Sequence, residues 1–204
     1  SRTVPFVSKA KAIPLAKIAS RVMAGERLSK FNLKSKTKNM FAVKEAVFPF
    51  NKFPNSDLIL GPEMKSTGEV MGFDKDLGMA FAKSQIAAGN SLPTKGLAFI
   101  SLKNSHKTEG IDLAKALTKL GFKLCATKGT AEFIGKEGIN CKKINKVSGG
   151  SPHIVDVLNS KQIAIVINTG GGSRKNRVSD AREIRRATLR NKVPYCTNMS
   201  TAYA

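Results

Sequence analysis

A buried strand followed by a glycine-rich turn is the feature that most restricts how this chain can fold. Residues 163–169 read IAIVINT, and residues 170–175 read GGGSRK. A continuous run of Ile and Val predicts a strand buried on both faces, as in a parallel sheet covered by helices. Its polar end would lie at the carboxyl edge, where open α/β sheets bind ligands. The glycines can turn backbone amides toward an anion, although a flexible surface loop would have the same composition.

Strands and helices alternate along the second half of the chain. Apolar runs predict strands at residues 97–102, 123–126, 140–147, 163–169 and 195–198. Helical spacing predicts helices at residues 113–120, 129–136, 152–160 and 178–191, with a further helix from residue 200. This alternation is typical of an α/β fold with a doubly wound parallel sheet.

The first half reads as a mixed α+β region. We expect the end of a strand at residues 3–7, a helix after Pro14, a strand from residue 41 and a helix capped by Asp74. A polar, glycine-containing stretch at residues 89–96 has the composition of a domain boundary. We therefore divide the chain into residues 1–92 and residues 93–204.

The formal net charge is +21, which favours an anionic partner such as a phosphorylated metabolite, a nucleic acid or an acidic subunit. Residues 1–92 carry 15 basic and 7 acidic side chains, and residues 93–204 carry 20 and 7. Both halves are therefore basic, and no basic tail is attached to a neutral domain. A lysine-rich proteome would give the same balance, so charge alone assigns no function.

Other sequence features narrow the class of protein. No apolar run approaches the roughly 20 residues that span a bilayer, so we expect no membrane segment. The three cysteines have no CxxC spacing, which suits a reducing cytoplasm, and the two histidines are not part of a metal-binding pattern. The chain starts at Ser1 without a Met, which suggests a fragment or a processed chain.

Polar residues follow successive strands of the predicted sheet. Thr127 and Thr130 bracket the start of a helix, where free amides and the helix dipole favour an anion. Lys107, Lys146 and the pair Asn168–Thr169 follow three other strands. Hydroxyls, amides and lysines at one sheet edge are what a phosphate or a nucleotide requires. A Thr-x-x-Thr pair alone is more often a helix cap, so the prediction rests on the convergence.

Several long motifs carry a resemblance to a known family. They are FAVKE at residues 41–45, PFNKFP at 49–54, LGPEMKSTGEVMG at 60–72, SRTVPFVSK at 1–9 and RVMAG at 21–25. Together they resemble the large chain of carbamoyl-phosphate synthase, and the similarity extends over essentially all 204 residues. The resemblance implies that residues 1–92 are the α+β tail of the second ATP-grasp unit, which forms carbamoyl phosphate. Residues 93–204 would be the allosteric domain, with the fold of methylglyoxal synthase.

The resemblance also implies three sets of site residues. Arg2, Lys44 and Glu69 are similar to residues that line the carbamate passage. Those similar to the ornithine contacts are Glu45, Tyr195 and Thr197. The residues similar to the pocket for UMP and IMP are Lys107, Thr127, Thr130, Lys146, Asn168 and Thr169.

Two positions depart from the family pattern. Gly170 stands where some members have a second Thr, and the glycine loop is one residue longer. Ala181 replaces a pocket Ser. These changes leave phosphate binding as the expectation and bear on recognition of the base or the ribose.

The resemblance implies a part of an ATP-dependent ligase that makes carbamoyl phosphate from glutamine or ammonia, bicarbonate and two ATP, for arginine and pyrimidine synthesis. The full subunit would use ATP with Mg or Mn, and K. This piece would hold no cofactor and be inactive alone. Expected partners are the glutamine amidotransferase small subunit and the effectors UMP, IMP and ornithine, in the cytoplasm. Neither a nucleic acid nor a membrane is expected, and a homo-oligomer stays open.

Two alternatives belong to other classes. A free-standing methylglyoxal-synthase-type lyase would place a catalytic aspartate after a Gly-Gly pair, but Gly149–Gly150 is followed by Ser151 and Pro152. Without that carboxylate the enolisation lacks its base. A nucleic-acid-binding protein would suit the charge, but aromatic residues are only 6% and do not alternate with the basic runs.

Overall fold

The computed structural model describes residues 3–35, 37–48, 66–170 and 175–204, and side chains at 175–179 are not among the described features. The described residues fall into two compact units. Residues 3–48 and 66–89 form the first unit, and residues 90–204 form the second.

The first unit combines helices with a two-stranded sheet. In order, its elements are α1 (Thr3–Lys11), α2 (Leu15–Met23), the 3-10 turn η1 (Leu28–Lys30), β1 (Phe41–Val47), β2 (Gly68–Asp74) and α3 (Leu77–Ala87). The helix predicted after Pro14 and the strand predicted from Phe41 are confirmed. The strand predicted at residues 3–7 is wrong, because this segment is the start of α1. Pro5 lies in its first turn, where a helix tolerates the missing N–H.

The strands β1 and β2 pair antiparallel, and α3 packs against them. Close packing depends on Gly72, because a Cβ at this position would overlap the Ala80 carbonyl oxygen. The cap of α3 is Asp76, whose Oδ1 accepts a hydrogen bond from the Met79 amide at 2.8 Å. Asp74 was expected to cap this helix, but it ends β2 and forms an ion pair with Lys83.

The second unit has the alternating order that the sequence predicts. In order, its elements are β3 (Gly96–Ser101), η3 (Asn104–His106), α4 (Lys107–Lys119), β4 (Phe122–Thr127), α5 (Lys128–Gly135), β5 (Cys141–Ile144), η4 (Val147–Gly149), α6 (Ile154–Asn159), β6 (Ile163–Asn168), α7 (Lys175–Arg190), β7 (Tyr195–Cys196) and α8 (Met199–Tyr203). The sheet order is β5-β4-β3-β6-β7, with all neighbouring pairs parallel. The α/β class with a doubly wound parallel sheet is confirmed, with β3 in the middle of the sheet and β6 beside it.

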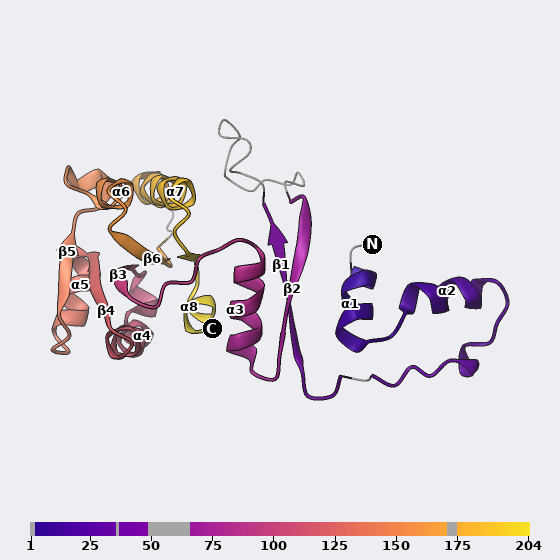
Figure 1. The fold of residues 1–204 in the computed structure, drawn as a ribbon. Coiled ribbons are helices and arrows are strands. Elements are labelled where there is room, and N and C mark those ends of the chain that lie inside the picture. The colour runs from indigo at the N-terminus through magenta and orange to yellow at the C-terminus, as the bar shows by residue number, and fades with distance from the viewer. Residues whose placement is uncertain (1–2, 36, 49–65, 171–174) are drawn as a thin grey trace. The chain divides into compact units, whose positions relative to one another are not determined.

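Helices cover both faces of this sheet (Figure 1). One apolar core joins Ala98 and Ile100 of β3 to side chains of α4, α5 and α8. The other joins Phe99 of the same strand to side chains of α6 and α7. Successive strand residues point to opposite faces, so burial on both sides explains why the strands read as unbroken apolar runs. In the part of the chain that the structure describes, no helix has the length and apolarity needed to cross a membrane.

Candidate effector pocket

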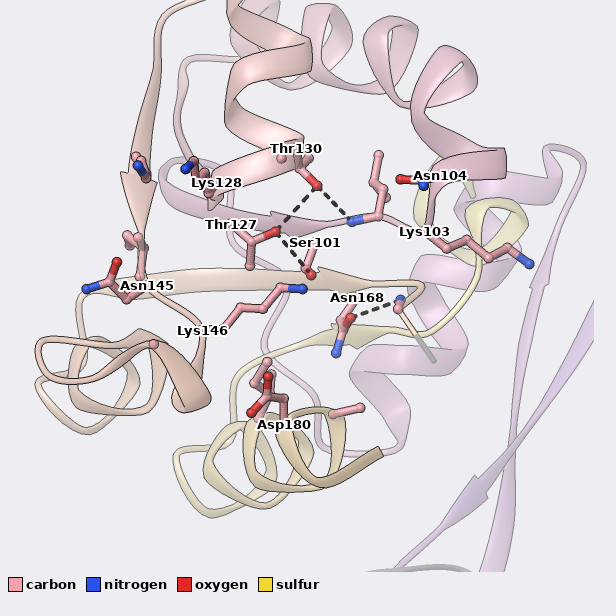
Figure 2. A pocket seen from close by; sticks show the side chains of 18 of the residues that line it. Ser101, Lys103, Asn104, Thr127, Lys128, Thr130, Asn145, Lys146, Asn168 and Asp180 are labelled. Atoms are coloured by element: carbon pink, nitrogen blue, oxygen red, sulfur yellow. Dashed lines mark hydrogen bonds between the residues drawn. The ribbon is translucent and has the colours of Figure 1, made fainter. Parts of the chain in front are cut away.

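A cavity of about 800 Å³ opens at the carboxyl edge of the five-stranded sheet. Residues that follow β3, β4, β5 and β6 line it, together with the first turns of α4 and α5 and one side of α7. Figure 2 shows these side chains converging from the separate strand ends. The convergence follows from the topology, because parallel strands deliver their carboxyl ends to one edge. The volume lies within the range of small-molecule sites in proteins.

Three buried hydroxyl groups form one wall of the cavity. Thr127 Oγ1 lies 3.5 Å from Ser101 Oγ and 3.4 Å from Thr130 Oγ1. Thr130 Oγ1 in turn accepts a hydrogen bond from the Leu102 amide at 3.2 Å. Since Thr130 Oγ1 acts as the acceptor toward the Leu102 amide, its own hydroxyl proton is available for donation to a group in the cavity. This wall therefore offers donors without a formal charge.

The start of α5 adds backbone donors to the hydroxyl wall. The N-cap residue of α5 is Thr127, and its side chain makes no capping hydrogen bond. The first-turn amides of α5 are therefore not capped by the Thr127 hydroxyl and can donate to a ligand. The Lys107 ammonium lies beside this turn, since a Cβ at Gly129 would be 3.5 Å from Lys107 Nζ. It also lies 5.8 Å from the centroid of the Phe133 ring. An anion here would contact both the positive end of the helix dipole and a lysine.

Asn168 is buried at the end of β6, and its orientation is fixed by hydrogen bonds. Its Oδ1 accepts from the Gly170 amide at 3.0 Å, and its Nδ2 donates to the Tyr195 hydroxyl at 3.3 Å. The Arg185 guanidinium carbon lies 5.8 Å from the centroid of the Tyr195 ring. Among the described residues no acceptor takes the second N–H of the Asn168 amide, so it can be donated to a ligand.

The opposite side of the cavity contains a carboxylate. Asp180 of α7 is 9% exposed, and its two oxygens accept from the Ser148 amide at 3.1 Å and from Ser148 Oγ at 2.8 Å. Both residues line the cavity, as do the alkyl side chains of Ala181 and Ile184. This pair of hydrogen bonds joins α7 to η4 across the cavity wall.

The structure brings together five of the six residues predicted for nucleotide binding. The five that line the cavity are Lys107, Thr127, Thr130, Lys146 and Asn168. Thr169 is not among the lining residues of the described cavity. Its hydroxyl accepts from the Lys103 amide at 3.3 Å, and its amide donates to the Ser101 carbonyl at 3.0 Å. Thr169 therefore positions the turn after β3. The predicted anion contacts in residues 171–174 lie outside the described residues.

The pocket also contains residues that the sequence did not single out. They are Ser101, Lys103, Asn104, Ser105, Lys128, Glu132, Lys143, Asn145, Ser148 and Asp180. Ser101 ends β3, so the rule that identified the other strand ends would have found it. No comparable signal marks Asp180, because its position depends on how α7 faces η4.

The first unit contains the residues predicted for a carbamate passage. Lys44 Nζ and Glu69 Oε2 form an ion pair at 3.0 Å across β1 and β2. Lys44 Nζ also lies 5.9 Å from the centroid of the Phe6 ring. Arg2 lies outside the described residues. The structure therefore brings two of these three residues together.

The residues predicted for ornithine are divided between the units. Glu45 lies on β1, and it is half-buried and hydrogen-bonded to Gln85. Burial raises the pKa of its carboxyl, and the Gln85 bond partly offsets this rise. Tyr195 and Thr197 lie in the second unit, where Tyr195 contacts Asn168. Within the described residues no cluster of three His, Cys, Asp or Glu side chains is placed to hold a metal.

Comparisons with known proteins agree with the resemblance seen in the motifs. Residues 109–197 match the family described as the MGS-like domain. The whole chain is 50% identical to the carbamoyl phosphate synthase large chain of Rhizobium meliloti, of which it covers 18%. It is also 48% identical to the carbamoyl phosphate synthase large chain, C-terminal section, of Aquifex aeolicus, of which it covers 41%.

Over its whole length the chain is therefore similar to carbamoyl phosphate synthase large chains. It spans about a fifth of the length of the Rhizobium meliloti relative and about two fifths of the Aquifex aeolicus one. A crystal structure of methylglyoxal synthase from Elizabethkingia anophelis aligns with a TM-score of 0.42 and 18% identity, over 55% of this chain and 77% of that one.

Proposed function

We propose that this chain is the regulatory end of a glutamine-dependent carbamoyl-phosphate synthase large subunit, and that its second unit binds a nucleoside monophosphate such as UMP or IMP. The observation that carries the proposal is the cavity at the carboxyl edge of the parallel sheet. It combines an uncapped helix start, a hydroxyl wall and five lysines, which are Lys103, Lys107, Lys128, Lys143 and Lys146.

The geometry suggests how the phosphate would be held. The first-turn amides of α5 and the Thr130 hydroxyl would donate to the phosphate oxygens, and Lys107 would supply the charge beside them. Hydrogen bonds in which one partner is ionised are about twice as strong as neutral ones, so each of these donors would contribute to the affinity and the ammonium would add an opposite charge. The solvent-exposed Lys146 would contribute less to phosphate affinity than the half-buried Lys107, because water screens the charge of an exposed side chain.

The catalytic activity belongs to the proposal for the whole subunit. We propose that ATP with Mg or Mn is bound by upstream parts of the subunit, and that the small subunit supplies ammonia. Lys44, Glu69 and Arg2 would line the path of carbamate. The 204 residues alone would then show no ATP-dependent turnover, which a coupled assay of ADP release can check.

Ornithine is proposed as a second effector. The residues proposed to recognise its ammonium and carboxylate groups are Glu45, Tyr195 and Thr197. In the full subunit, Glu45→Ala should abolish activation by ornithine and leave the response to UMP in place. An unchanged response to ornithine would refute this assignment.

The nucleotide site can be tested with two lysines of one helix. Lys107 begins α4 at the pocket, and Lys119 ends the same helix at its exposed far end. By calorimetric titration with UMP, Lys107→Ala should weaken binding roughly 10- to 100-fold, which corresponds to losing one charged hydrogen bond. Lys119→Ala should bind UMP like the parent chain. Equal affinities for the two variants would contradict the proposed site.

A further inference from the structure

The short segment between β3 and α4 supplies several side chains of the pocket. Lys103, Asn104, Ser105 and Lys107 line the cavity, and all four lie between the end of β3 and the first turn of α4. Figure 2 labels Lys103 and Asn104 on this segment. We call residues 102–106 the β3–α4 turn. The positions of these side chains depend on what holds the backbone of this turn.

Two threonine hydroxyls hold the first two amides of the β3–α4 turn. The Leu102 amide donates to Thr130 Oγ1 at 3.2 Å, and the Lys103 amide donates to Thr169 Oγ1 at 3.3 Å. The two threonines come from different elements, since Thr130 lies in α5 and Thr169 follows β6. The ladder of β3 ends before these amides, so side-chain oxygens take the place of a neighbouring strand.

Thr169 holds the chain on both sides of Leu102. Its amide donates to the Ser101 carbonyl at 3.0 Å, and its hydroxyl accepts from the Lys103 amide. The Lys103 carbonyl in turn accepts from the His106 amide at 3.0 Å, which closes η3. Thr169 itself is 8% exposed and is not among the residues that line the described cavity. A change at Thr169 therefore reaches the cavity through the backbone of the turn.

We infer that Thr169 is a positioning residue for nucleotide binding. Its hydroxyl fixes the Lys103 peptide, and this peptide sets where the turn presents Lys103 and Asn104 to a ligand. A turn that is not held in advance has to be ordered when the ligand binds, and this ordering lowers the affinity. The Thr169 hydroxyl thus contributes to affinity without contacting the ligand. This inference rests on the proposed function, because it concerns the affinity of the same pocket.

Two other roles for the Thr169 hydroxyl predict different results. If the hydroxyl contacted the ligand directly, its removal would leave the ligand-free turn unchanged. If it contributed only to the overall stability of the second unit, its removal would loosen the strands and the turn alike. A positioning role loosens the β3–α4 turn selectively, and it does so before any ligand is added.

Thr169→Val and Thr169→Ser separate these roles in the ligand-free 204-residue chain. Valine keeps the shape of threonine and removes the acceptor, whereas serine keeps the acceptor. Amide hydrogen exchange of Lys103 should accelerate roughly 3- to 10-fold in Thr169→Val, as expected for one lost hydrogen bond. The amides of Cys125 in β4 and Val166 in β6 should exchange as in the parent chain. In Thr169→Ser all three amides should exchange at the parent rates.

Calorimetric titration with UMP gives the functional readout. Thr169→Val should weaken UMP binding roughly 3- to 10-fold, and Thr169→Ser should bind UMP within about twofold of the parent chain. The matched control is Thr188→Val. Thr188 is fully buried in α7, its hydroxyl donates to the Ile184 carbonyl at 2.7 Å, and it does not line the described cavity. This control also loses a buried hydrogen bond, and it should bind UMP like the parent chain.

The combined results decide between the roles. Unchanged exchange of Lys103 in ligand-free Thr169→Val overturns the inference, whether or not UMP binding weakens. Equal acceleration at Lys103, Cys125 and Val166 assigns Thr169 to overall stability and also overturns it. Parent-like UMP affinity in Thr169→Val overturns the inference and leaves the nucleotide site in place. If UMP does not bind the parent chain, the proposed function itself fails, and the inference fails with it.

Discussion

The Asn168 amide donates a hydrogen bond to the Tyr195 hydroxyl at 3.3 Å and thereby connects the pocket to β7. Asn168 lines the cavity, whereas Tyr195 belongs to the residues proposed for ornithine. Tyr195, a residue proposed for ornithine binding, therefore orients Asn168, a residue of the proposed nucleotide site. Allosteric coupling is typically about 1–3 kcal/mol, and one hydrogen bond of this kind could supply part of it.

This contact predicts that Tyr195→Phe weakens the nucleotide site. Removing the hydroxyl takes away one of the two described hydrogen bonds that orient the Asn168 side chain, and we expect UMP affinity to fall by about fivefold, the equivalent of one neutral hydrogen bond. Tyr203→Phe is the matched control, because the Tyr203 hydroxyl donates to the Glu109 carbonyl at 2.8 Å and does not line the cavity. Calorimetric titration gives both affinities. An unchanged affinity in Tyr195→Phe would exclude this positioning role.

The strand-end residues were predictable because the topology follows from a sequence pattern. Unbroken apolar runs separated by helical segments specify a parallel sheet, which places Thr127, Lys146 and Asn168 at one edge. Thr169 was also predicted for the pocket, but the structure turns it toward the Lys103 amide. Side-chain direction after a strand end depends on the backbone of the turn, and an apolar strand pattern does not specify it.

Other features depend on contacts between distant segments. The strand β2 was not predicted, because residues 61–72 are dense in glycine and polar groups and show no alternating apolar pattern. Its pairing with β1 and the packing of Gly72 on Ala80 make it a strand. The Asp180–Ser148 contact joins segments 32 residues apart, and neither residue belongs to a periodic pattern.

The close contact at Gly72 predicts a strong effect on stability. Gly72→Ala would drive a methyl group into the Ala80 backbone of α3, and overpacking of this kind costs about 1–3 kcal/mol or more. Gly68→Ala in the same strand is the control, because a Cβ there meets no atom within 4 Å. Hydrogen exchange of the β1 and β2 amides should accelerate in Gly72→Ala and stay close to the parent in Gly68→Ala. Equal protection in the two variants would contradict the packing.

The three thiols should be unreactive in the folded chain. Burial raises the pKa of Cys125 to about 12, with a further contribution from Cys141, and raises the pKa of Cys141 and of Cys196 to about 11. The reactive thiolate is then about one part in a thousand or less at pH 8. Iodoacetamide labelling followed by mass spectrometry should show little modification of the native chain and three modified cysteines after denaturation. Rapid labelling of native Cys125 would refute its burial.

The half-buried Glu45 predicts a pH dependence of the first unit. Burial raises the pKa of its carboxyl in the folded state, so the folded state binds the proton more tightly than the unfolded one. Its contribution to stability is therefore most favourable below the ordinary carboxyl pKa and is lost as pH rises through the raised value. Glu45→Gln should flatten this part of the stability profile in urea unfolding at a series of pH values. A steeper profile in the variant would contradict the sign of the shift.

Amide NMR during a UMP titration tests most directly whether a nucleoside monophosphate binds at the carboxyl edge of the parallel sheet. Binding at this edge predicts saturable shifts at the start of α5, at residues 128–130, and at residues 103 and 146–148, while the amides of β1 and β2 stay unchanged. Saturable shifts confined to other elements, or no shifts at millimolar UMP, would contradict it.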